Sequence, residues 1–374
     1  MKDGKGMKPS LRYRLDRMTR AVVMRVIGWI THGATEQRVD LLREDVKTVL
    51  LVRGNFRMGG AILATPAILL FRENFPTARI DFVGSILSKA LFRNLPLDHH
   101  YEVYRSFPKV LWSYVLLLKR IRSGSYDLAV DVSGSNSAMG AFIVGFSGAR
   151  FRAGLRGKWE KWFNLRYSRP ASKNKYYNLP ELVGSMGLKT SSVFPTVVLS
   201  AKEKEQGQNR LETIVGEGRG PVAGIFAGGR KTRGKRWPKE HFFEIASRLR
   251  AERISPIIFV GPEEKELIGY FRNMSRELIP LVFEPNLREF ASLVAACDLF
   301  VTCDSGPVHL ACALRVRTVA IFLQRSFDRW GPPNDLSRIV YRDAGATVDD
   351  VLEVCLHELN DRCADRDQLQ TIND

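Results

Sequence analysis

A run of six residues, Asp304 to His309 (DSGPVH), combines residue types that bind an anion where a strand gives way to a helix. Backbone N–H groups are exposed at a helix start, Ser305 adds a hydroxyl, and Gly306 lets a ligand approach the backbone closely. His309 follows about one helical turn later, able to face the same ligand. The run predicts an anion site; the alternative is Asp304 or Ser305 as an ordinary N-cap, with His309 in the core.

A second turn, Gly228-Gly229-Arg230, is followed by Lys235-Arg236-Trp237-Pro238 just before an expected helix. Cations strengthen hydrogen bonds to phosphate oxygens, so a glycine turn that carries Arg230 and Lys235 can wrap a diphosphate. A solvated basic loop, with Trp237 packed at the helix entry, is the alternative.

Two carboxylates, Glu263 and Glu264, come directly after Gly261-Pro262 at the end of another expected strand. A carboxylate at such a place can accept hydrogen bonds from ribose hydroxyls, as acidic residues do in dinucleotide-binding folds. The same residues also complement the dipole of the helix that they begin, which is the alternative explanation.

The elements that position these turns alternate between strand-like and helix-like segments, as in βαβ units on a parallel sheet. The expected strands KTVLLV (47–52) and DLFVTCD (298–304), and the strand and glycine turn PVAGIFAGG (221–229), each lead into one of the polar or glycine-rich turns. Ligands of open α/β sheets bind at the carboxyl ends of the strands, where these turns fall. The 374 residues exceed what one core usually supports, so two α/β units are expected, with the seam near residues 185–200.

Residues 151–178 interrupt the alternation, because they are basic, aromatic and without clear periodicity. We expect a long functional loop or a partly helical excursion there rather than core elements. Its Trp159, Trp162 and Tyr176 are candidates for stacking on sugars.

The net charge of +17 is clustered rather than spread. Nine Lys/Arg lie in residues 150–175 and six in residues 228–239, which favours anionic partners. Nucleic acid is one such partner, but no recognised nucleic-acid motif accompanies the charge. The five cysteines fit neither a zinc site nor a disulfide framework, which indicates a reducing compartment.

The N-terminal segment 11–30 has apolar residues at helical spacing, with arginines among the others. Such a basic amphipathic helix can lie in a membrane interface, and it can equally pack on its own domain. No stretch has the roughly 18 uninterrupted apolar residues that a spanning helix needs.

In chain order, these segments resemble glycosyltransferase family 9, which includes the lipopolysaccharide heptosyltransferases. The resemblance covers roughly residues 47–335. Two further segments match the family. Its Gly-Asp turn and the following Thr-Pro helix resemble Met58-Gly59-Gly60 and Thr65-Pro66, and its YDLVIDLQG-like strand resembles Tyr126 to Asp131. The ordered co-occurrence of DSGxxH and KRWP is what makes the resemblance specific.

The resemblance implies an α/β protein with the GT-B fold, that is, two facing Rossmann-like domains with parallel sheets. It also implies inverting, metal-independent sugar transfer from a nucleotide sugar. On this basis we expect a basic amphipathic N-terminal extension (1–45), an acceptor-side domain (46–190), a nucleotide-sugar-binding domain (191–345), and a C-terminal helix and tail (346–374).

The resemblance also assigns roles to residues. Lys235 would contact the donor phosphate, Glu264 or Glu263 the ribose, and His309 with Ser305–Gly306 the diphosphate. The remaining residues implied in donor binding are Gly228, Gly229, Arg230 and Asp304, and those of the acceptor-side turn are Gly59, Gly60 and Thr65.

One departure concerns the general base, which the family places on the acid of the Gly-Asp turn. Gly60 occupies that position here. A missing base removes about 10²–10⁴-fold in rate but leaves binding intact. Asp131, at the carboxyl end of a neighbouring strand, is the candidate replacement; the alternative is an aspartate that orders a turn.

The sequence therefore predicts an enzyme, a glycosyltransferase that transfers a heptose or similar sugar to a lipopolysaccharide, lipid-linked or other glycan acceptor. No cofactor and no metal site are expected, and the donor, ADP-linked sugars among the candidates, is a substrate. We expect a cytoplasmic protein, peripheral on the inner membrane face where the N-terminal helix meets acidic lipid, without specific nucleic-acid binding. A nucleotide-sugar-binding protein that has lost catalysis is the main alternative.

Overall fold

The computed structural model describes residues 33–371 except 55, 105–108, 192, 217–219, 230–233, 276–277 and 334–336, with only the backbone given for 109–113 and 361–371. The expected amphipathic helix in residues 11–30 and the candidate donor residue Arg230 lie outside the described residues. Within the described residues, none of the helices combines the length and the apolar composition needed to cross a membrane.

The first half of the chain forms a six-stranded parallel sheet in the order β3-β2-β1-β4-β5-β6. Its strands are β1 (Thr48–Val52), β2 (Arg79–Gly84), β3 (His99–Glu102), β4 (Leu128–Asp131), β5 (Phe151–Leu155) and β6 (Leu165–Tyr167). The helices of this half are α2 (Met58–Ile62), α3 (Thr65–Asn74), α4 (Ile86–Leu91), α5 (Lys109–Ser123), α6 (Ala138–Phe146) and α7 (Asn178–Ser185), with 3₁₀ turns η1 (Leu41–Arg43) and η2 (Glu160–Trp162).

The second half repeats the plan with the parallel order β12-β11-β10-β7-β8-β9. Its strands are β7 (Val222–Phe226), β8 (Ser255–Val260), β9 (Leu281–Phe283), β10 (Leu299–Cys303), β11 (Arg317–Ile321) and β12 (Ser337–Val340). Its helices are α8 (Ala201–Val215), α9 (Lys239–Ala251), the 3₁₀ helix η4 (Pro262–Leu267), α10 (Ile268–Ser275), α11 (Leu287–Ala296), α12 (Gly306–Ala313), α13 (Phe327–Trp330) and α14 (Val348–Thr371).

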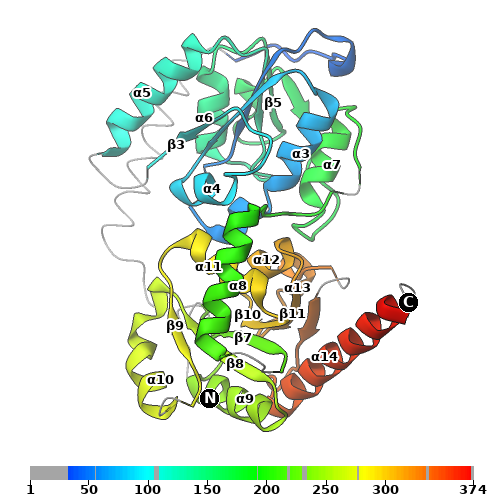
Figure 1. Ribbon diagram of the computed structural model, residues 1–374. Coiled ribbons are helices and arrows are strands. Elements are labelled where there is room, and N and C mark those ends of the chain that lie inside the picture. The colour runs from blue at the N-terminus through cyan, green and yellow to red at the C-terminus, as the bar shows by residue number, and fades with distance from the viewer. Residues whose placement is uncertain are drawn as a thin grey trace.

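The central strands are mostly apolar because helices cover both faces of each sheet. Every residue of β7 and β10 is buried, as are four of the five residues of β1. The expected two α/β units with parallel sheets are confirmed, and they lie one above the other in Figure 1.

The expectation of a loop in residues 151–178 is wrong for its first part. β5 and β6 extend the first sheet, and Gly154 of β5 lies so close to the ring of Phe163 that a side chain would not fit. Trp162 and Tyr176 are buried in the protein, and Trp159 stacks on Trp162 with ring centroids 5.8 Å apart. Trp162 and Tyr176 therefore stabilise the fold instead of offering free faces to a sugar, while Trp159 is half-buried.

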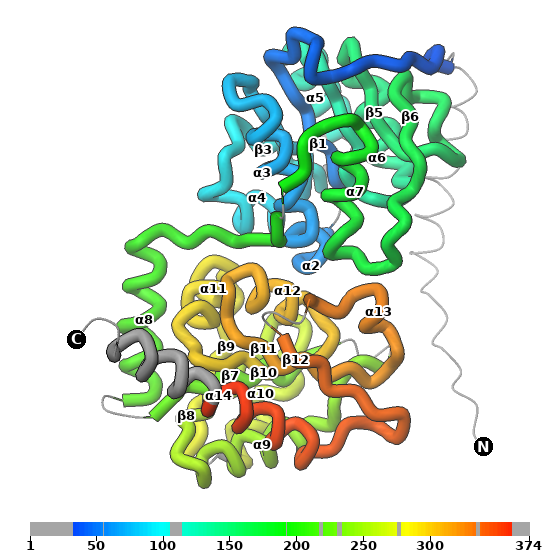
Figure 2. Tube along the Cα trace, turned by 90° about the vertical axis from the view of Figure 1, so that its right-hand side faces the viewer, coloured from blue at the N-terminus to red at the C-terminus, as the bar shows by residue number. Residues whose placement is uncertain are grey.

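The two halves meet at the carboxyl ends of their central strands, where α2 packs on α12 and α4 on α11 (Figure 2). Arg288 of α11 joins this seam: it is buried, forms an ion pair with Glu203 at 2.6 Å, and donates to the backbone oxygen of Val198 at 2.9 Å. Ligand sites of α/β sheets form at such strand ends, so a ligand site is expected at the seam.

The connecting segment between α7 and α8 is bonded to both halves. Thr196 N–H donates to the hydroxyl of Thr65 on α3 at 2.9 Å, and the adjacent Val197 N–H donates to the carbonyl of Ala313 at the end of α12 at 3.1 Å. The Thr65 hydroxyl itself donates to the Ile62 carbonyl at 2.8 Å. Thr65, expected in the acceptor-side turn, thus has a structural contact with the connection between the halves.

Candidate active site

Gly59 of α2 lies against His309 of α12 across the seam. A Cβ atom on Gly59 would lie 2.4 Å from Cδ2 of the imidazole, so only glycine lets the two helices approach this closely. Nδ1 of His309 shares a hydrogen bond of 2.7 Å with the hydroxyl of Tyr176, which is itself buried. Burial lowers the pKa of His309 to about 4, so the ring is neutral at physiological pH.

The start of α12 carries the predicted anion site. Ser305 is the N-cap but makes no capping hydrogen bond, and its hydroxyl lies 3.4 Å from that of Thr302. A Cβ on Gly306 would come within 3.2 Å of the Met58 side chain from the other half. The start of α12 therefore lies at the seam, next to the turn that begins α2.

Lys235 and Asp304 form an ion pair beside this helix start, and the hydroxyl of Ser326 donates to the same carboxylate at 2.7 Å. Both charged side chains are largely buried, with 15% and 9% of their surfaces exposed. The lysine has three N–H donors, of which one goes to Asp304 and one to the hydroxyl of Ser326 at 3.4 Å, so one is left for a ligand.

The glycine turn after β7 is tied to the carboxylate of Glu264. Gly229 has φ of +154°, and a Cβ there would lie 2.5 Å from the carbonyl oxygen of Lys235. Its N–H points to Glu264 Oε1 at 3.4 Å, while Nη2 of Arg236 lies 3.6 Å from the same oxygen. Burial raises the pKa of the Glu264 carboxyl.

Glu263 differs from its neighbour because it is exposed at the start of η4, while Glu264 is buried. A Cβ on Gly261 would lie 2.8 Å from Glu264 Oε2, so the glycine makes room for that carboxylate. The structure therefore brings Glu264, and not Glu263, to the glycine turn. Gly228 belongs to the same turn, where a Cβ would collide with the ring of Phe226.

Asp131 lies on the other side of the seam, at the end of β4 next to Val52 of β1. Only 4% of its surface is exposed, the N–H of Ser133 donates to Oδ1 at 3.0 Å, and a Cβ on Gly140 would lie 2.5 Å from the carboxylate. Burial raises the pKa of Asp131 to about 7, against the opposing effects of Ser133 and of the positive charge of Arg53. A carboxyl with such a pKa can exchange a proton near neutral pH.

The predicted donor-side residues that the structure describes thus gather around one helix start: Gly228, Gly229, Lys235, Glu264, Asp304, Ser305, Gly306 and His309. Sequence reasoning missed Ser326, Tyr176 as the partner of His309, and Arg53 beside Asp131. Gly59 and Gly60 are both buried in α2. Among the described residues, no group of three or more His, Cys, Asp or Glu is placed to hold a metal ion.

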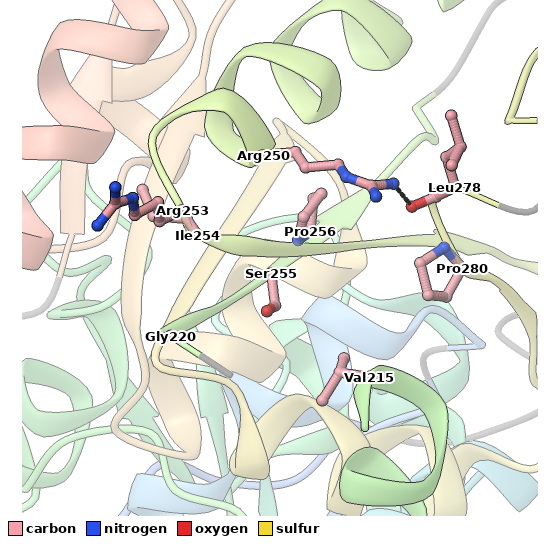
Figure 3. Close-up of a pocket in the computed structure, with 9 residues that line it drawn as sticks. All are labelled: Val215, Gly220, Arg250, Arg253, Ile254, Ser255, Pro256, Leu278 and Pro280. Atoms are coloured by element: carbon pink, nitrogen blue, oxygen red, sulfur yellow. Dashed lines mark hydrogen bonds between the residues drawn. The ribbon is translucent and has the colours of Figure 1, made fainter. Parts of the chain in front are cut away.

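A separate cavity of about 210 Å³ lies at the opposite ends of β7 and β8, lined by residues such as Gly220, Ser255 and Pro280 (Figure 3). Arg250 lines this cavity and donates to the backbone oxygen of Leu278. Because the cavity is at the amino ends of the strands, it does not belong to the site at the seam.

Comparison with known proteins agrees with this arrangement. The profile of glycosyltransferase family 9 (heptosyltransferase) matches residues 115–356, which is more than half of the chain. The chain belongs to glycosyltransferase family 9. It is therefore a glycosyltransferase.

Two relatives of this family 9 chain are heptosyltransferases. Lipooligosaccharide heptosyltransferase 2 of Campylobacter jejuni (strain 81116) is 26% identical over 291 residues, which cover 76% of this chain and 85% of the relative. Lipopolysaccharide heptosyltransferase 2 of Escherichia coli K12 is 25% identical over 315 residues, covering 78% and 87%.

Solved structures show that the family 9 chain has the GT-B fold of the heptosyltransferases. The ADP-heptose lipopolysaccharide heptosyltransferase II of E. coli superimposes with a TM-score of 0.71 at 21% identity, covering 84% of this chain and 99% of the other. An E. coli heptosyltransferase with ADP-2-deoxy-2-fluoro heptose superimposes with a TM-score of 0.65 at 16% identity, covering 83% of this chain and 99% of the other.

Proposed function

We propose that this glycosyltransferase transfers a heptose or a similar sugar from an ADP-linked donor to a lipopolysaccharide or other lipid-linked glycan, with inversion and without a metal. The relatives named above are lipopolysaccharide and lipooligosaccharide heptosyltransferases, and one structural neighbour holds an ADP-heptose analogue. The observation that carries the proposal is the ion pair of Lys235 beside the start of α12, opposite the glycine turn of α2.

The donor would lie across the start of α12. Lys235, Arg230 and the N–H groups of Ser305 and Gly306 would hold the diphosphate, and Glu264 would accept hydrogen bonds from the ribose hydroxyls. The acceptor oxygen attacks the anomeric carbon as the bond to the diphosphate breaks, and the departing phosphate keeps the electron pair. Fixed positive charge at this point stabilises the leaving group.

Asp131 is the proposed base that takes the proton of the acceptor hydroxyl. Its pKa of about 7 suits that role, because the carboxylate is present at physiological pH and still basic enough to accept a proton. His309 is neutral, and its hydrogen bond to Tyr176 fixes the orientation of the imidazole beside the proposed donor site.

A donor screen tests the proposal directly. ADP-, UDP- and GDP-linked sugars are titrated by calorimetry into the wild type, Lys235→Met and the control Lys239→Met, whose lysine lies over the ring of Tyr270. We expect ADP-sugar binding that weakens about tenfold or more in Lys235→Met only. No binding of any nucleotide sugar, or equal affinities of the two variants, would contradict the proposal.

A nucleotide-sugar-binding protein without transferase turnover is the second candidate, favoured by Gly60 in place of the expected acid and by the burial of Asp131. This alternative predicts donor binding with neither transfer nor donor hydrolysis. Turnover that is present in the wild type and lost in Asp131→Asn would exclude it.

We propose that the enzyme works at the inner face of the membrane, because a lipid-linked acceptor lies there. The charge of +17 supports an encounter with acidic lipid. Sedimentation with vesicles of acidic and of neutral lipid tests it, and equal binding to both would contradict an electrostatic attachment.

A further inference from the structure

Tyr176 belongs to the first half of the chain, yet its side chain contacts a donor-side residue of the second half. It lies in the segment before α7, and its hydroxyl oxygen is 2.7 Å from Nδ1 of His309 on α12. The two ring centroids are 5.5 Å apart, and both side chains are buried. The neighbouring Lys175 N–H donates to the carbonyl of Arg329 in the second half at 2.9 Å. These bonds hold the hydroxyl in a fixed place beside α12.

The imidazole of His309 carries one proton, because burial lowers its pKa to about 4. One ring nitrogen is therefore a donor and the other an acceptor, and the hydrogen bonds decide which is which. Burial raises the pKa of the Tyr176 hydroxyl well above its ordinary value of 10, so this group also keeps its proton. Either the hydroxyl donates to Nδ1 and the ring proton is on Nε2, or Nδ1–H donates to the hydroxyl oxygen.

The acceptors near the Tyr176 hydroxyl favour the first arrangement. The other polar group beside it is the thiol of Cys312, which follows His309 by three residues on the same face of α12. A thiol sulfur is a weak acceptor, whereas the unprotonated nitrogen of a neutral imidazole accepts a full hydrogen bond. The phenolic proton therefore lies in the bond to Nδ1, which leaves the ring proton on Nε2.

Nε2 is the ring nitrogen that a ligand can reach. A Cβ on Gly59 would lie 3.2 Å from Nε2, so this edge of the imidazole lies against a residue that has no side chain. Within the described residues Nε2 has no hydrogen-bond partner, and it is not one of the solvent-shielded polar atoms that lack one. Its N–H can therefore donate to a ligand in the seam, one helical turn from the start of α12.

We propose that Tyr176 is a positioning residue that holds His309 in the tautomer with the proton on Nε2, so that this N–H donates to an oxygen of the donor diphosphate. The proposal rests on the proposed function and deepens it, because the first half of the chain then sets a hydrogen-bond donor of the nucleotide-sugar site in the second. The other tautomer would turn a lone pair toward the diphosphate. Negative charge grows on the diphosphate as the sugar leaves, so the N–H stabilises the transition state more than the bound donor.

Nitrogen-15 NMR of the full chain, labelled at its six histidines, measures the tautomer directly. The signals of His309 are identified by their loss in His309→Gln. At pH 7 we expect a protonated Nε2 whose signal moves when ADP is added. The signal of the unprotonated Nδ1 should change in Tyr176→Phe and stay unchanged in the control Tyr177→Phe, whose ring is 48% exposed.

A proton on Nδ1 in the wild type overturns the proposal, as does an Nε2 signal that stays unchanged while calorimetry shows that ADP binds. The wild-type spectrum needs no substitution in Tyr176, so it decides the tautomer even where a variant disturbs the fold. If no nucleotide binds at all, the proposed function fails as well, and this result is distinct from ADP binding with the proton on Nδ1.

A double-mutant cycle separates positioning from a merely structural contact. Tyr176→Phe should lower kcat roughly threefold to tenfold with the KM of the acceptor unchanged, whereas Tyr177→Phe changes neither. In His309→Gln the amide nitrogen takes the place of Nε2 and has no tautomer to be set, so the added Tyr176→Phe should lower kcat by less than about twofold. An equal loss of kcat in both backgrounds overturns the proposal, because Tyr176 would then act independently of His309.

Discussion

Replacing Asp131 by asparagine should raise the stability of the protein and lower its activity, because the buried carboxylate destabilises the fold and is the proposed base. The ordinary pKa of 3.8 and the value of about 7 in the protein differ by roughly three. Each pKa unit corresponds to about 1.4 kcal/mol, so the ionised side chain costs about 4 kcal/mol of folding free energy. Asparagine keeps an oxygen for the N–H of Ser133 and removes the charge.

The stability gained by Asp131→Asn should increase with pH. Below about pH 4 the carboxyl is protonated in the folded and the unfolded chain, so the substitution changes stability little. Between pH 4 and 7 the unfolded chain is ionised first, so the wild type loses stability as pH rises through about 7. At pH 8.5 we expect Asp131→Asn to melt about 5 °C above the wild type.

Thermal unfolding at pH 4.5 and 8.5 measures the stability, and a transfer assay measures kcat/KM across the same range. For the wild type, kcat/KM should rise with pH and level off above about 7, whereas the variant should lose about 10²–10⁴-fold. A stability gain that is equal at both pH values refutes the burial argument. Full activity of the variant refutes the assignment of the base.

Two further substitutions test the seam, each against a matched control. Gly59→Ala should lower kcat/KM about tenfold or more, because the new methyl group meets the ring of His309. The control Gly269→Ala on α10 meets nothing within 4 Å and should leave kcat/KM unchanged. Equal activities of the two variants would show that the close approach of Gly59 and His309 is not needed. Arg288→Met should lower the free energy of unfolding by roughly 3 kcal/mol, measured with denaturant, because it breaks a buried ion pair. Arg93→Met removes a mostly exposed partner of the same carboxylate and should change that free energy by less than about 1 kcal/mol, and similar losses in both would contradict the assigned burial.

The sequence was most informative where apolar runs end in chemically specific turns. β1, β7 and β10 are predictable because a parallel strand covered on both faces must be mostly apolar. The shorter strands could not be predicted from apolar runs. His99–Glu102 forms the edge strand β3 although it contains no aliphatic residue, and β6 is three residues long within a basic segment.

The site was predictable in its residue types but not in its long-range partners. Nothing in the local sequence indicates that Tyr176 bonds His309 across 133 positions, or that Arg53 is held by the carbonyl of Val132. The choice between Glu263 and Glu264 was open for a similar reason, since it depends on which side of a short 3₁₀ helix faces the glycine turn. Such contacts follow from the packing of the halves, which no short motif encodes.

The bonds of Thr196 and Val197 define how the enzyme can move. These neighbouring residues are bonded to opposite halves, one to α3 and one to the end of α12. A sliding displacement of one half over the other would break at least one of the two bonds, whereas a rotation about the peptide between them keeps both. The enzyme should therefore open and close for its substrates as a hinge whose axis passes close to this peptide, with little translation along the seam.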